Sequence, residues 1–395
     1  MLFLWSEVIK ILLKDMLKQS YYYDKNGMLL QGNCIEQIKL LPDESIDMVI
    51  TSPPYWGLRN YGTDPQIWDE DKNCKHEWIE EITKRPNSSG GQKSKKLNIK
   101  GKDNFQEFTD YHNRYTSSDF CNKCGAWMGE LGLEPTFGLY IKHLINIFDK
   151  IWRVLKKEGT CWVNIGDTYA ANRSYQVKGT KQIDGSQPKA KQPQAKDNNV
   201  KNKSLYGIPD RFKIAMIDNG WICRNEIVWY KPNVMPSSAK DRFTVDFEKV
   251  YFFTKSEKYF FEQQLEPYAQ PMNRWGGDKL KADGKSDWDE GTGQSTYRER
   301  NMRPNPKGRN KRCVWEINTQ PLKEAHFAVF PPELVETPVL AGCPEGGIVL
   351  DPFIGSGNTA IKVIELGKKY IGIDLNEKYV EMTKKRIIEN KLNNL

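Results

Sequence analysis

Short apolar runs alternate with longer amphipathic runs over residues 331–395, and this pattern constrains the fold more than any other. The expected elements are a helix over 331–342, a strand over 348–351, a helix from Thr359, a strand over 370–375 and a helix from Glu377. Strands this short, joined by helices, pair in parallel because the chain must cross back over the sheet between them. The region therefore predicts a parallel sheet with helices on its faces.

The same alternation recurs in three other parts of the chain. It predicts a strand–helix–strand unit over 28–50, a helix over 136–155 with a strand over 160–169, and a helix over 208–219 with strands over 221–232 and 249–255. The predicted fold class is α/β, a doubly wound, mostly parallel, Rossmann-like sheet. One discontinuous catalytic domain would comprise 20–70, 126–170, 205–261 and 313–395.

Three stretches lose this periodicity, and they predict irregular insertions on the one sheet. They are 71–125, a basic loop over 171–204, and 262–312. Within them, residues 171–203 carry eight basic and two acidic side chains, and 298–312 carry seven basic ones against Glu299. Each stretch alone fits a solvated loop, but two together, interspersed with aromatic and amide side chains, favour a polyanion such as nucleic acid.

The opening segment, MLFLWSEVIKILLKDMLK, is apolar at helical spacing but interrupted by charged residues. It predicts a docking helix. The sequence contains no run of eighteen apolar residues, so no membrane span is expected. Eight cysteines in a chain without a secretory signal indicate a reducing compartment. A cytoplasmic protein with no membrane partner is expected.

A rigid turn follows the apolar strand that ends at Thr51, in the sequence ITSPPYWG. Pro53 and Pro54 cannot donate to a sheet ladder, so they end the strand and stiffen the turn. Ser52 and Tyr55 then lie at the carboxyl end of a strand, where open α/β sheets bind their ligands. The turn is a candidate site for a flat, polar ligand.

A glycine turn, DPFIGSGNTA over 351–360, joins a strand to a helix. Gly355 and Gly357 allow the backbone to approach a ligand at the start of that helix. The next strand ends at Asp374, where a carboxylate can accept hydrogen bonds from both hydroxyls of a ribose; a helix N-cap is the alternative role. The Gly-Lys-Ser/Thr signature of a phosphate-binding loop is missing, so a nucleoside cofactor with little phosphate fits best.

Together, Asp351-Pro-Phe-x-Gly-Ser-Gly and Ser52-Pro-Pro-Tyr55 resemble the motifs of S-adenosylmethionine-dependent DNA methyltransferases that modify exocyclic amino groups. The catalytic motif precedes the cofactor motif, which is the order of the family's β group. The resemblance implies S-adenosylmethionine as cofactor, double-stranded DNA as partner and target recognition by 262–312. It also allows a homodimer and a cognate restriction endonuclease for the same site. Within 262–312, the arginines suit forked contacts to guanine edges and phosphates, and an indole and two amides would add stacking and base-edge contacts: Arg298, Arg300, Arg303, Arg309 and Arg312, with Trp275, Asn273 and Asn301.

The resemblance assigns site residues by position. The catalytic turn would be Ser52, Pro53, Pro54 and Tyr55, and the cofactor-binding residues Asn33, Phe327, Asp351, Phe353, Gly355, Ser356, Gly357, Thr359 and Asp374. Asn164, Gly166 and Asp167 would close a strand end near the pocket. His326 is expected to cap a helix or make a structural hydrogen bond, and Trp56 either walls the site or packs under the turn.

The family's chemistry would transfer a methyl group directly to the amino nitrogen of a base flipped out of the duplex. Serine at the first position of the motif favours N4 of cytosine, and N6 of adenine is the alternative. Methylation of RNA or of a protein amide is a further alternative, and so is a DNA-binding protein with an inactive cofactor site. The intact motifs speak against the last of these.

Two pairs of metal-ligand residues lie in and near the first insertion: Cys74 with His76, and Cys121 with Cys124. Their four sulfur and nitrogen atoms match a tetrahedral structural zinc site, which would staple a segment with little core of its own. The alternatives are that His112 replaces His76, or that the four side chains are unrelated.

Overall fold

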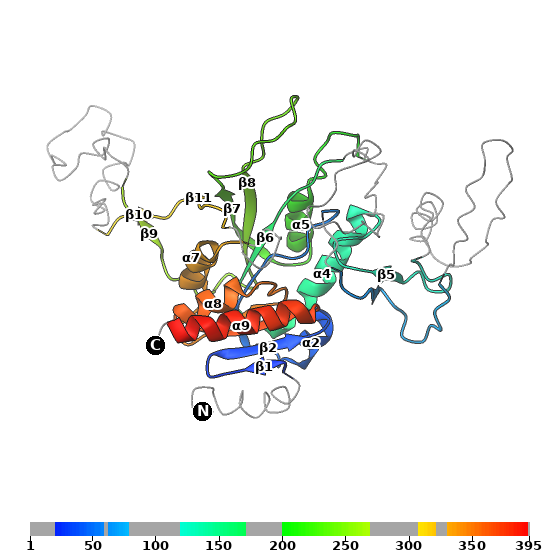
Figure 1. The fold of residues 1–395 in the computed structure, drawn as a ribbon, viewed down its shortest axis with the longest axis horizontal. Coiled ribbons are helices and arrows are strands. Elements are labelled where there is room, and N and C mark those ends of the chain that lie inside the picture. Colours follow the sequence, from blue (N-terminus) through cyan, green and yellow to red (C-terminus); the bar gives the residue numbers. More distant parts are fainter. Residues whose placement is uncertain are drawn as a thin grey trace, which may run out of the picture.

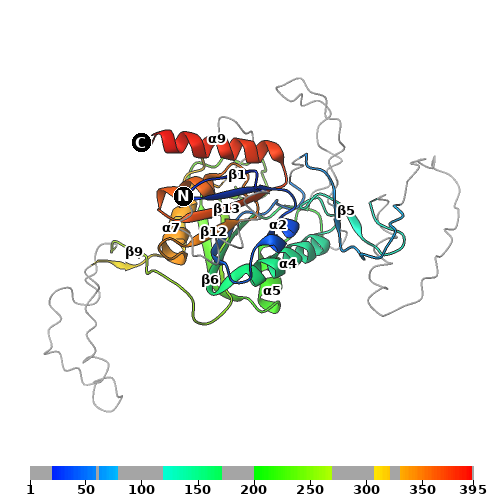
Figure 2. The same cartoon turned by 90° about the horizontal axis from the view of Figure 1, so that it is seen from below.

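A sheet of nine strands forms the centre of the described chain in the computed structural model (Figures 1 and 2). The model describes residues 20–58, 62–78, 119–170, 200–268, 307–320 and 330–393. The strand order is β1–β2–β13–β12–β3–β6–β8–β7–β11. The run from β2 to β6 is parallel, and β8 runs antiparallel to both β6 and β7. The predicted doubly wound, mostly parallel sheet is confirmed.

The strands of this sheet are β1 (Tyr22–Tyr23), β2 (Gly27–Gln31), β3 (Ile46–Thr51), β6 (Leu155–Ile165), β7 (Ile222–Tyr230), β8 (Phe247–Thr254), β11 (Val314–Glu316), β12 (Ile348–Asp351) and β13 (Lys369–Asp374). The helices are α2 (Cys34–Leu40), α4 (Phe137–Val154), α5 (Ile208–Asp218), α7 (Pro332–Gly342), α8 (Asn358–Glu365) and α9 (Glu377–Asn393). Two short ribbons pair β4 (Gln66–Trp68) with β5 (Trp127–Gly129), and β9 (Leu265–Glu266) with β10 (Arg309–Asn310).

The sheet is buried on both faces because successive strand residues point to opposite sides. On β3, Val49 packs into a core that includes residues of α2, α4 and α5. Its neighbours Met48 and Ile50 pack into a second core with α7, α8 and α9. The near-continuous apolar strands read from the sequence follow from this double burial.

Several elements differ from the expectation, and the start of β6 and the edge strand β11 are two of them. Strand β6 begins at Leu155, directly after α4, rather than at Thr160. The sequence did not indicate this earlier start because Lys156, Lys157 and Glu158 are charged, and the register with β3 shifts across them. The short edge strand β11 was not predicted. It adds in parallel to β7 through Trp315, its single buried residue, and three residues carry too little pattern to be recognised.

The two ribbons extend from the core on opposite sides in both views (Figures 1 and 2). The β4–β5 ribbon brackets the predicted insertion 71–125, and the β9–β10 ribbon pairs the two ends of the segment 262–312. No helix within the described ranges is long and apolar enough to cross a bilayer.

Candidate functional site

The carboxyl ends of the parallel strands open onto a cavity of about 310 Å³. The turn after β3 forms one wall, and the loop after β12 with the end of β13 forms the facing wall. The first, here called the catalytic wall, includes Ser52, Pro53, Pro54 and Tyr55; the second, the cofactor wall, includes Phe353, Gly355, Ser356 and Asp374. The structure therefore brings both motifs, some 300 residues apart, to one cavity.

The catalytic turn is fixed to the core beneath it. Thr51 donates to Asp351 Oδ1 at 2.7 Å, which ties the two motifs together directly. The Pro54 carbonyl accepts from the Tyr140 hydroxyl at 2.8 Å. Trp56 is fully buried and its indole N–H donates to the main chain at 2.8 Å, so it packs under the turn and forms no wall of the site.

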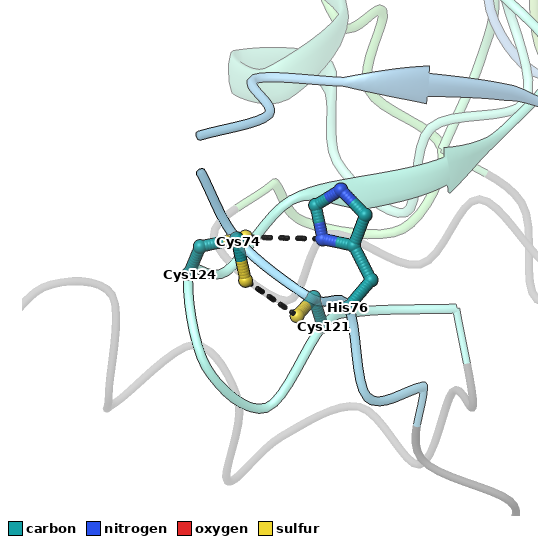
Figure 3. A group of neighbouring side chains, drawn as sticks. All are labelled: Cys74, His76, Cys121 and Cys124. Atoms are coloured by element: carbon teal, nitrogen blue, oxygen red, sulfur yellow. Dashed lines mark hydrogen bonds between the residues drawn. The ribbon is translucent and has the colours of Figure 1, made fainter. Parts of the chain in front are cut away.

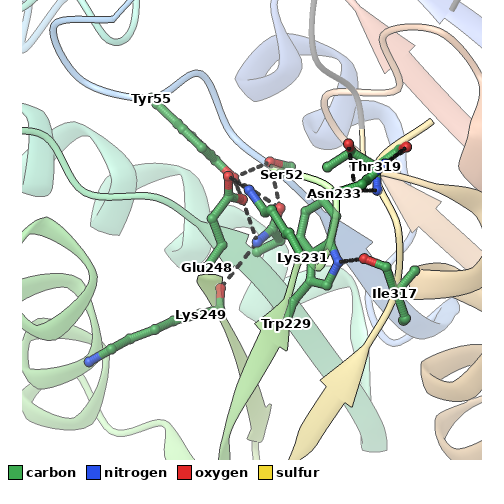
Figure 4. Close-up of polar contacts among 10 residues, drawn as sticks. Ser52, Tyr55, Trp229, Lys231, Asn233, Glu248, Lys249, Ile317 and Thr319 are labelled. Atoms are coloured by element: carbon green, nitrogen blue, oxygen red, sulfur yellow. Dashed lines mark hydrogen bonds and ion pairs between the residues drawn. The ribbon is translucent and has the colours of Figure 1, made fainter. Parts of the chain in front are cut away.

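The Tyr55 side chain is held at both its ring and its hydroxyl, and Figure 4 shows the contacts of the hydroxyl. The hydroxyl lies 2.7 Å from Glu248 Oε2 and 2.9 Å from Asn164 Oδ1. Ser52 Oγ lies 3.3 Å from the same hydroxyl. The ring packs on Gly166 so closely that a Cβ there would stand 2.6 Å from a ring carbon. Tyr55 is therefore preorganised by neighbours from β6 and β8.

Among the cavity residues that were missed in the sequence are Trp229, Lys231 and Glu248. The Lys231 ammonium pairs with Glu248 Oε1 and lies 4.4 Å from the centroid of the Trp229 ring. The Trp229 indole donates to Ile317 O at 2.9 Å (Figure 4). The sequence signal for Glu248, a charged residue ahead of the apolar part of β8, becomes usable only once the antiparallel direction of that strand is known. The start of an antiparallel strand lies at the same edge as the ends of its parallel neighbours.

Asp374 faces the cavity from the end of β13. Its Oδ2 accepts from Gly355 N at 3.0 Å and its Oδ1 from Asn376 N at 2.8 Å. Each carboxylate oxygen can accept a second hydrogen bond, so these contacts orient the group without exhausting it. Burial raises the pKa of Asp374 to about 6.

Three members of the cofactor motif lie behind the wall and do not line the cavity. Asp351 is buried and accepts from Thr359 at 2.6 Å, and burial raises its pKa to about 6. Gly357 has φ of +82°, and a Cβ there would stand 2.6 Å from the side chain of Thr383 on α9. These residues support the turn, while Gly355, whose added Cβ would make only a van der Waals contact with Phe353 O at 3.8 Å, borders the cavity.

Of the other expected site residues, one borders the cavity, one caps a helix beside it, and two lie outside the described residues. Asn33 lies at the cavity and caps α2, accepting from Ile35 N at 2.8 Å, and donates to Gln66 on β4 at 2.9 Å. Asp167 accepts from Gly207 N and Ile208 N, so it caps α5 beside the site. Phe327 and His326 lie outside the described residues.

The two pairs of metal-ligand residues meet in space, although Cys74 and Cys121 are 47 positions apart in the sequence. One ligand atom from each of Cys74, His76, Cys121 and Cys124 lies within 4.8 Å of the other three. His112 lies outside the described residues.

Of the arginines expected to contact DNA, Arg309 and Arg312 both bind Glu266, at 2.9 and 2.6 Å. The other residues expected to contact DNA lie outside the described residues: Arg298, Arg300, Arg303, Asn273, Trp275 and Asn301.

A mostly parallel sheet whose carboxyl edge carries a cavity between a Ser-Pro-Pro-Tyr turn and a glycine turn is the arrangement of an S-adenosylmethionine-dependent methyltransferase. The family model described as DNA methylase, of the N6 and N4 type, matches residues 46–385. The chain belongs to this DNA methylase family, and the resemblance drawn from the two motifs is confirmed. It is a DNA methyltransferase directed at amino nitrogens, with S-adenosylmethionine as methyl donor.

Relatives of nearly the same length match the chain along most of its course. The Type II methyltransferase M.Cfr9I of Citrobacter freundii is 31% identical over 375 residues, 94% of this chain and 92% of that protein. M.SmaI of Serratia marcescens is 31% identical over 366 residues, 92% and 91%. The solved structure of PvuII DNA methyltransferase (cytosine-N4-specific) covers 95% of this chain and 94% of its own at 16% identity, with a TM-score of 0.51. This last likeness supports the fold.

Proposed function

We propose that this enzyme transfers a methyl group to N4 of a cytosine flipped out of double-stranded DNA. The observation that carries the proposal is the single cavity in which the Ser52–Tyr55 turn faces Asp374 and the glycine turn. One wall is suited to an amino group and the other to a nucleoside donor, so donor and acceptor can meet in one place.

The turn would activate a poor nucleophile. The lone pair of an exocyclic amino nitrogen is conjugated into its ring, and hydrogen bonds accepted from the amino hydrogens draw it out of conjugation. The Ser52 hydroxyl and the Pro53 carbonyl are suitable acceptors, and Pro53 and Pro54 keep them in place. Preorganised acceptors of this kind account for much of the rate in comparable sites.

Tyr55 would stack on the flipped base. Its hydroxyl is tied to Glu248 and Asn164 and its ring is packed on Gly166. An immobilised ring offers a stacking face at little cost in conformational entropy. The network around Tyr55 therefore serves to position the base, with Asn164 and Glu248 as positioning residues.

The cofactor wall would hold the donor. We propose that Asp374 accepts hydrogen bonds from the ribose hydroxyls, that Phe353 packs on an apolar part of the cofactor, and that the Gly355–Ser356 backbone lies against it. Asn33 borders the same space. S-adenosylmethionine bound there supplies a methyl group on a sulfonium, which an amino nitrogen can attack without a covalent enzyme intermediate.

The choice of cytosine rests on Ser52 and on Lys231. Serine at the first motif position favours cytosine, as does a cation beside the turn. Cytosine carries two acceptors, N3 and O2, along the Watson–Crick edge that bears its amino group, whereas adenine carries N1 on that edge and N7 on the other side of its amino group. Lys231 has donors left after its bond to Glu248. Adenine N6 is the second candidate, because it offers the same amino group to the turn.

Tritium transfer from labelled S-adenosylmethionine to duplex DNA, RNA and protein, followed by nucleoside mass spectrometry, tests this proposal. N4-methylcytosine in duplex DNA is expected, with Ser52→Ala as the inactive control. N6-methyladenine would replace the choice of base but keep the reaction. Label in RNA or protein alone, or none with any substrate, would overturn the proposed substrate or the proposed activity.

We further propose that 262–312, assisted by the loop 171–204, recognises the target sequence. The supporting observations are the arginine-rich composition of 298–312 and its place between the β7–β8 hairpin and the cofactor half. Replacing 262–312 by the matching segment of a relative with a different site should transfer the donor's specificity. A hybrid that keeps the original specificity would exclude this segment.

The type II naming of the relatives supports a role in a restriction–modification system. We propose that a restriction endonuclease for the same site is the functional partner. The enzyme would protect host DNA, so cleavage-sensitive sites should become resistant when it is expressed. A homodimer stays a prediction, which sedimentation of the purified enzyme would check.

A further inference from the structure

The four-residue cluster at the end of the β4–β5 ribbon has the dimensions of a metal site (Figure 3). Cys74 Sγ lies 3.8 Å from Cys121 Sγ, and Cys124 Sγ lies 3.4 Å from His76 Nδ1. Zinc bonds of about 2.3 Å to sulfur and about 2.0–2.1 Å to nitrogen, at tetrahedral angles, place two sulfurs about 3.8 Å apart and sulfur and nitrogen about 3.6 Å apart. The two measured contacts match two edges of such a tetrahedron.

The backbone around Cys121 is shaped to present sulfur to a metal. Lys123 N donates to Cys121 Sγ at 3.4 Å, and Gly125 N donates to Cys121 O at 2.9 Å. Gly125 has φ of +78°, which lets the chain reverse after Cys124. An amide that donates to sulfur favours the thiolate form, which is the form that binds metal. This turn therefore points to a ligand independently of the cluster's dimensions.

We propose that Cys74, His76, Cys121 and Cys124 bind one structural zinc ion. Three sulfurs and one imidazole form a ligand set that binds zinc in preference to magnesium or calcium. All four positions of a tetrahedron come from the protein, so none is left for water or substrate and the ion has no part in methyl transfer.

The zinc would fix the ribbon that closes one side of the cavity. Its ligands come from segments that flank β4 and β5, and Asn122 N donates to Glu77 O at 2.9 Å between them. From this ribbon, Gln66 and Trp68 reach the cavity. After β5, Gly132 O accepts from Gly57 N, just beyond the catalytic turn, at 2.8 Å. Loss of zinc would loosen the β4–β5 ribbon, which borders the cavity, and cofactor binding would weaken as a result.

Elemental analysis of full-length enzyme purified without added metal tests the proposal and does not depend on activity. About one zinc per chain is expected. Cys124→Ser should lose most of it and melt at a lower temperature, whereas Cys313→Ser, at an exposed cysteine outside the cluster, should keep it. Cobalt-loaded enzyme should show the thiolate charge-transfer and tetrahedral d–d bands, and Cys124→Ser should weaken them.

If Cys124→Ser does not fold, titration of wild-type enzyme with a mercurial in the presence of a zinc indicator still decides. Zinc release in step with the loss of thiols supports the site. A metal-free, fully folded wild-type enzyme would overturn it, and so would a Cys74–Cys121 disulfide found by mass spectrometry. Because zinc content is measured directly, these outcomes are distinct from failure of the proposed methyl transfer.

Discussion

The two walls of the cavity are built in different ways. The catalytic wall is held by side chains from four strands, with Tyr55 bound to Asn164 and Glu248 across 109 and 193 residues of sequence. The cofactor wall is held largely by its own neighbourhood, since Asp374 accepts from the backbone of Gly355 and Asn376, which are 19 and 2 residues away. One wall depends on the whole sheet, and the other mainly on two adjacent strands.

This contrast suggests that each wall can be damaged without the other. Side chains that orient a base affect the chemical step, whereas a carboxylate at a ribose affects ground-state binding of the donor. The hydrogen bond from Thr51 to Asp351 joins the strands that carry the two walls. A substitution there would therefore affect both the chemical step and cofactor binding.

The largest expected effect is on the catalytic wall. Tyr55→Ala should lower the rate of methyl transfer by roughly 100-fold or more, because the base would lose its stacking face and its alignment. Affinity for S-adenosylmethionine should stay near the wild-type value. Tritium transfer and calorimetry measure the two quantities.

Tyr55→Phe is the matched control, because it keeps the ring and removes only the hydroxyl with its contacts to Glu248, Asn164 and Ser52. It should lose much less activity than Tyr55→Ala. Wild-type turnover in Tyr55→Ala would mean that the turn is not the catalytic wall.

The next effect is on the cofactor wall. Asp374→Ala should weaken binding of S-adenosylmethionine by about 1.5–3 kcal/mol, or roughly 10- to 150-fold, the usual range for hydrogen bonds to a charged group. The rate at saturating cofactor should change little. Titration calorimetry gives the affinity, and unchanged affinity would remove Asp374 from the ribose site.

Cofactor binding should also depend on pH. Because the pKa of Asp374 is raised to about 6, its carboxylate is charged above that pH and becomes protonated as the pH falls through it. A protonated carboxyl is the weaker acceptor for ribose hydroxyls, so affinity should fall about tenfold from pH 7 to pH 5.

Calorimetry across this range with Asp374→Asn separates the two buried carboxyls. The variant should bind weakly with a flat profile. A fall of the same size in the variant would assign the titration to Asp351, whose pKa is also about 6.

The smallest expected effect concerns the support of Tyr55. Glu248→Gln removes the charge that binds both the Tyr55 hydroxyl and Lys231, and turnover should fall roughly 10-fold, by analogy with the loss of one charge-assisted hydrogen bond. The matched control is Glu226→Gln, which breaks bonds to Lys213 and Lys249 away from the cavity lining. Equal losses in both variants would show a general effect on the hairpin.

The same contrast explains what could be predicted from sequence. The cofactor wall follows from short-range pattern, since a strand, a glycine turn and an acid at the end of the next strand lie within 25 residues or so of each other. The parallel core follows from apolar strands buried on both faces.

The support of the catalytic wall could not be predicted, because it depends on which edge of the sheet each strand end reaches. Glu248 and Lys231 carry no motif. Because β8 runs antiparallel to β6 and β7, its first residues, with Glu248, lie beside the end of β7, with Lys231, and beside Tyr55. Gly357 and Thr359 belong to the cofactor motif but do not line the cavity, because motif membership does not reveal which residues border the cavity and which support the turn.

Single-turnover methyl transfer, with enzyme in excess over a labelled duplex and the S-adenosylmethionine concentration varied, tests the separation of the two walls most directly. Tyr55→Ala should lower the plateau rate and leave the half-saturating concentration unchanged. Asp374→Ala should raise the half-saturating concentration and leave the plateau unchanged. If both variants shifted both quantities together, the two walls would act as one unit and the division of roles would be wrong.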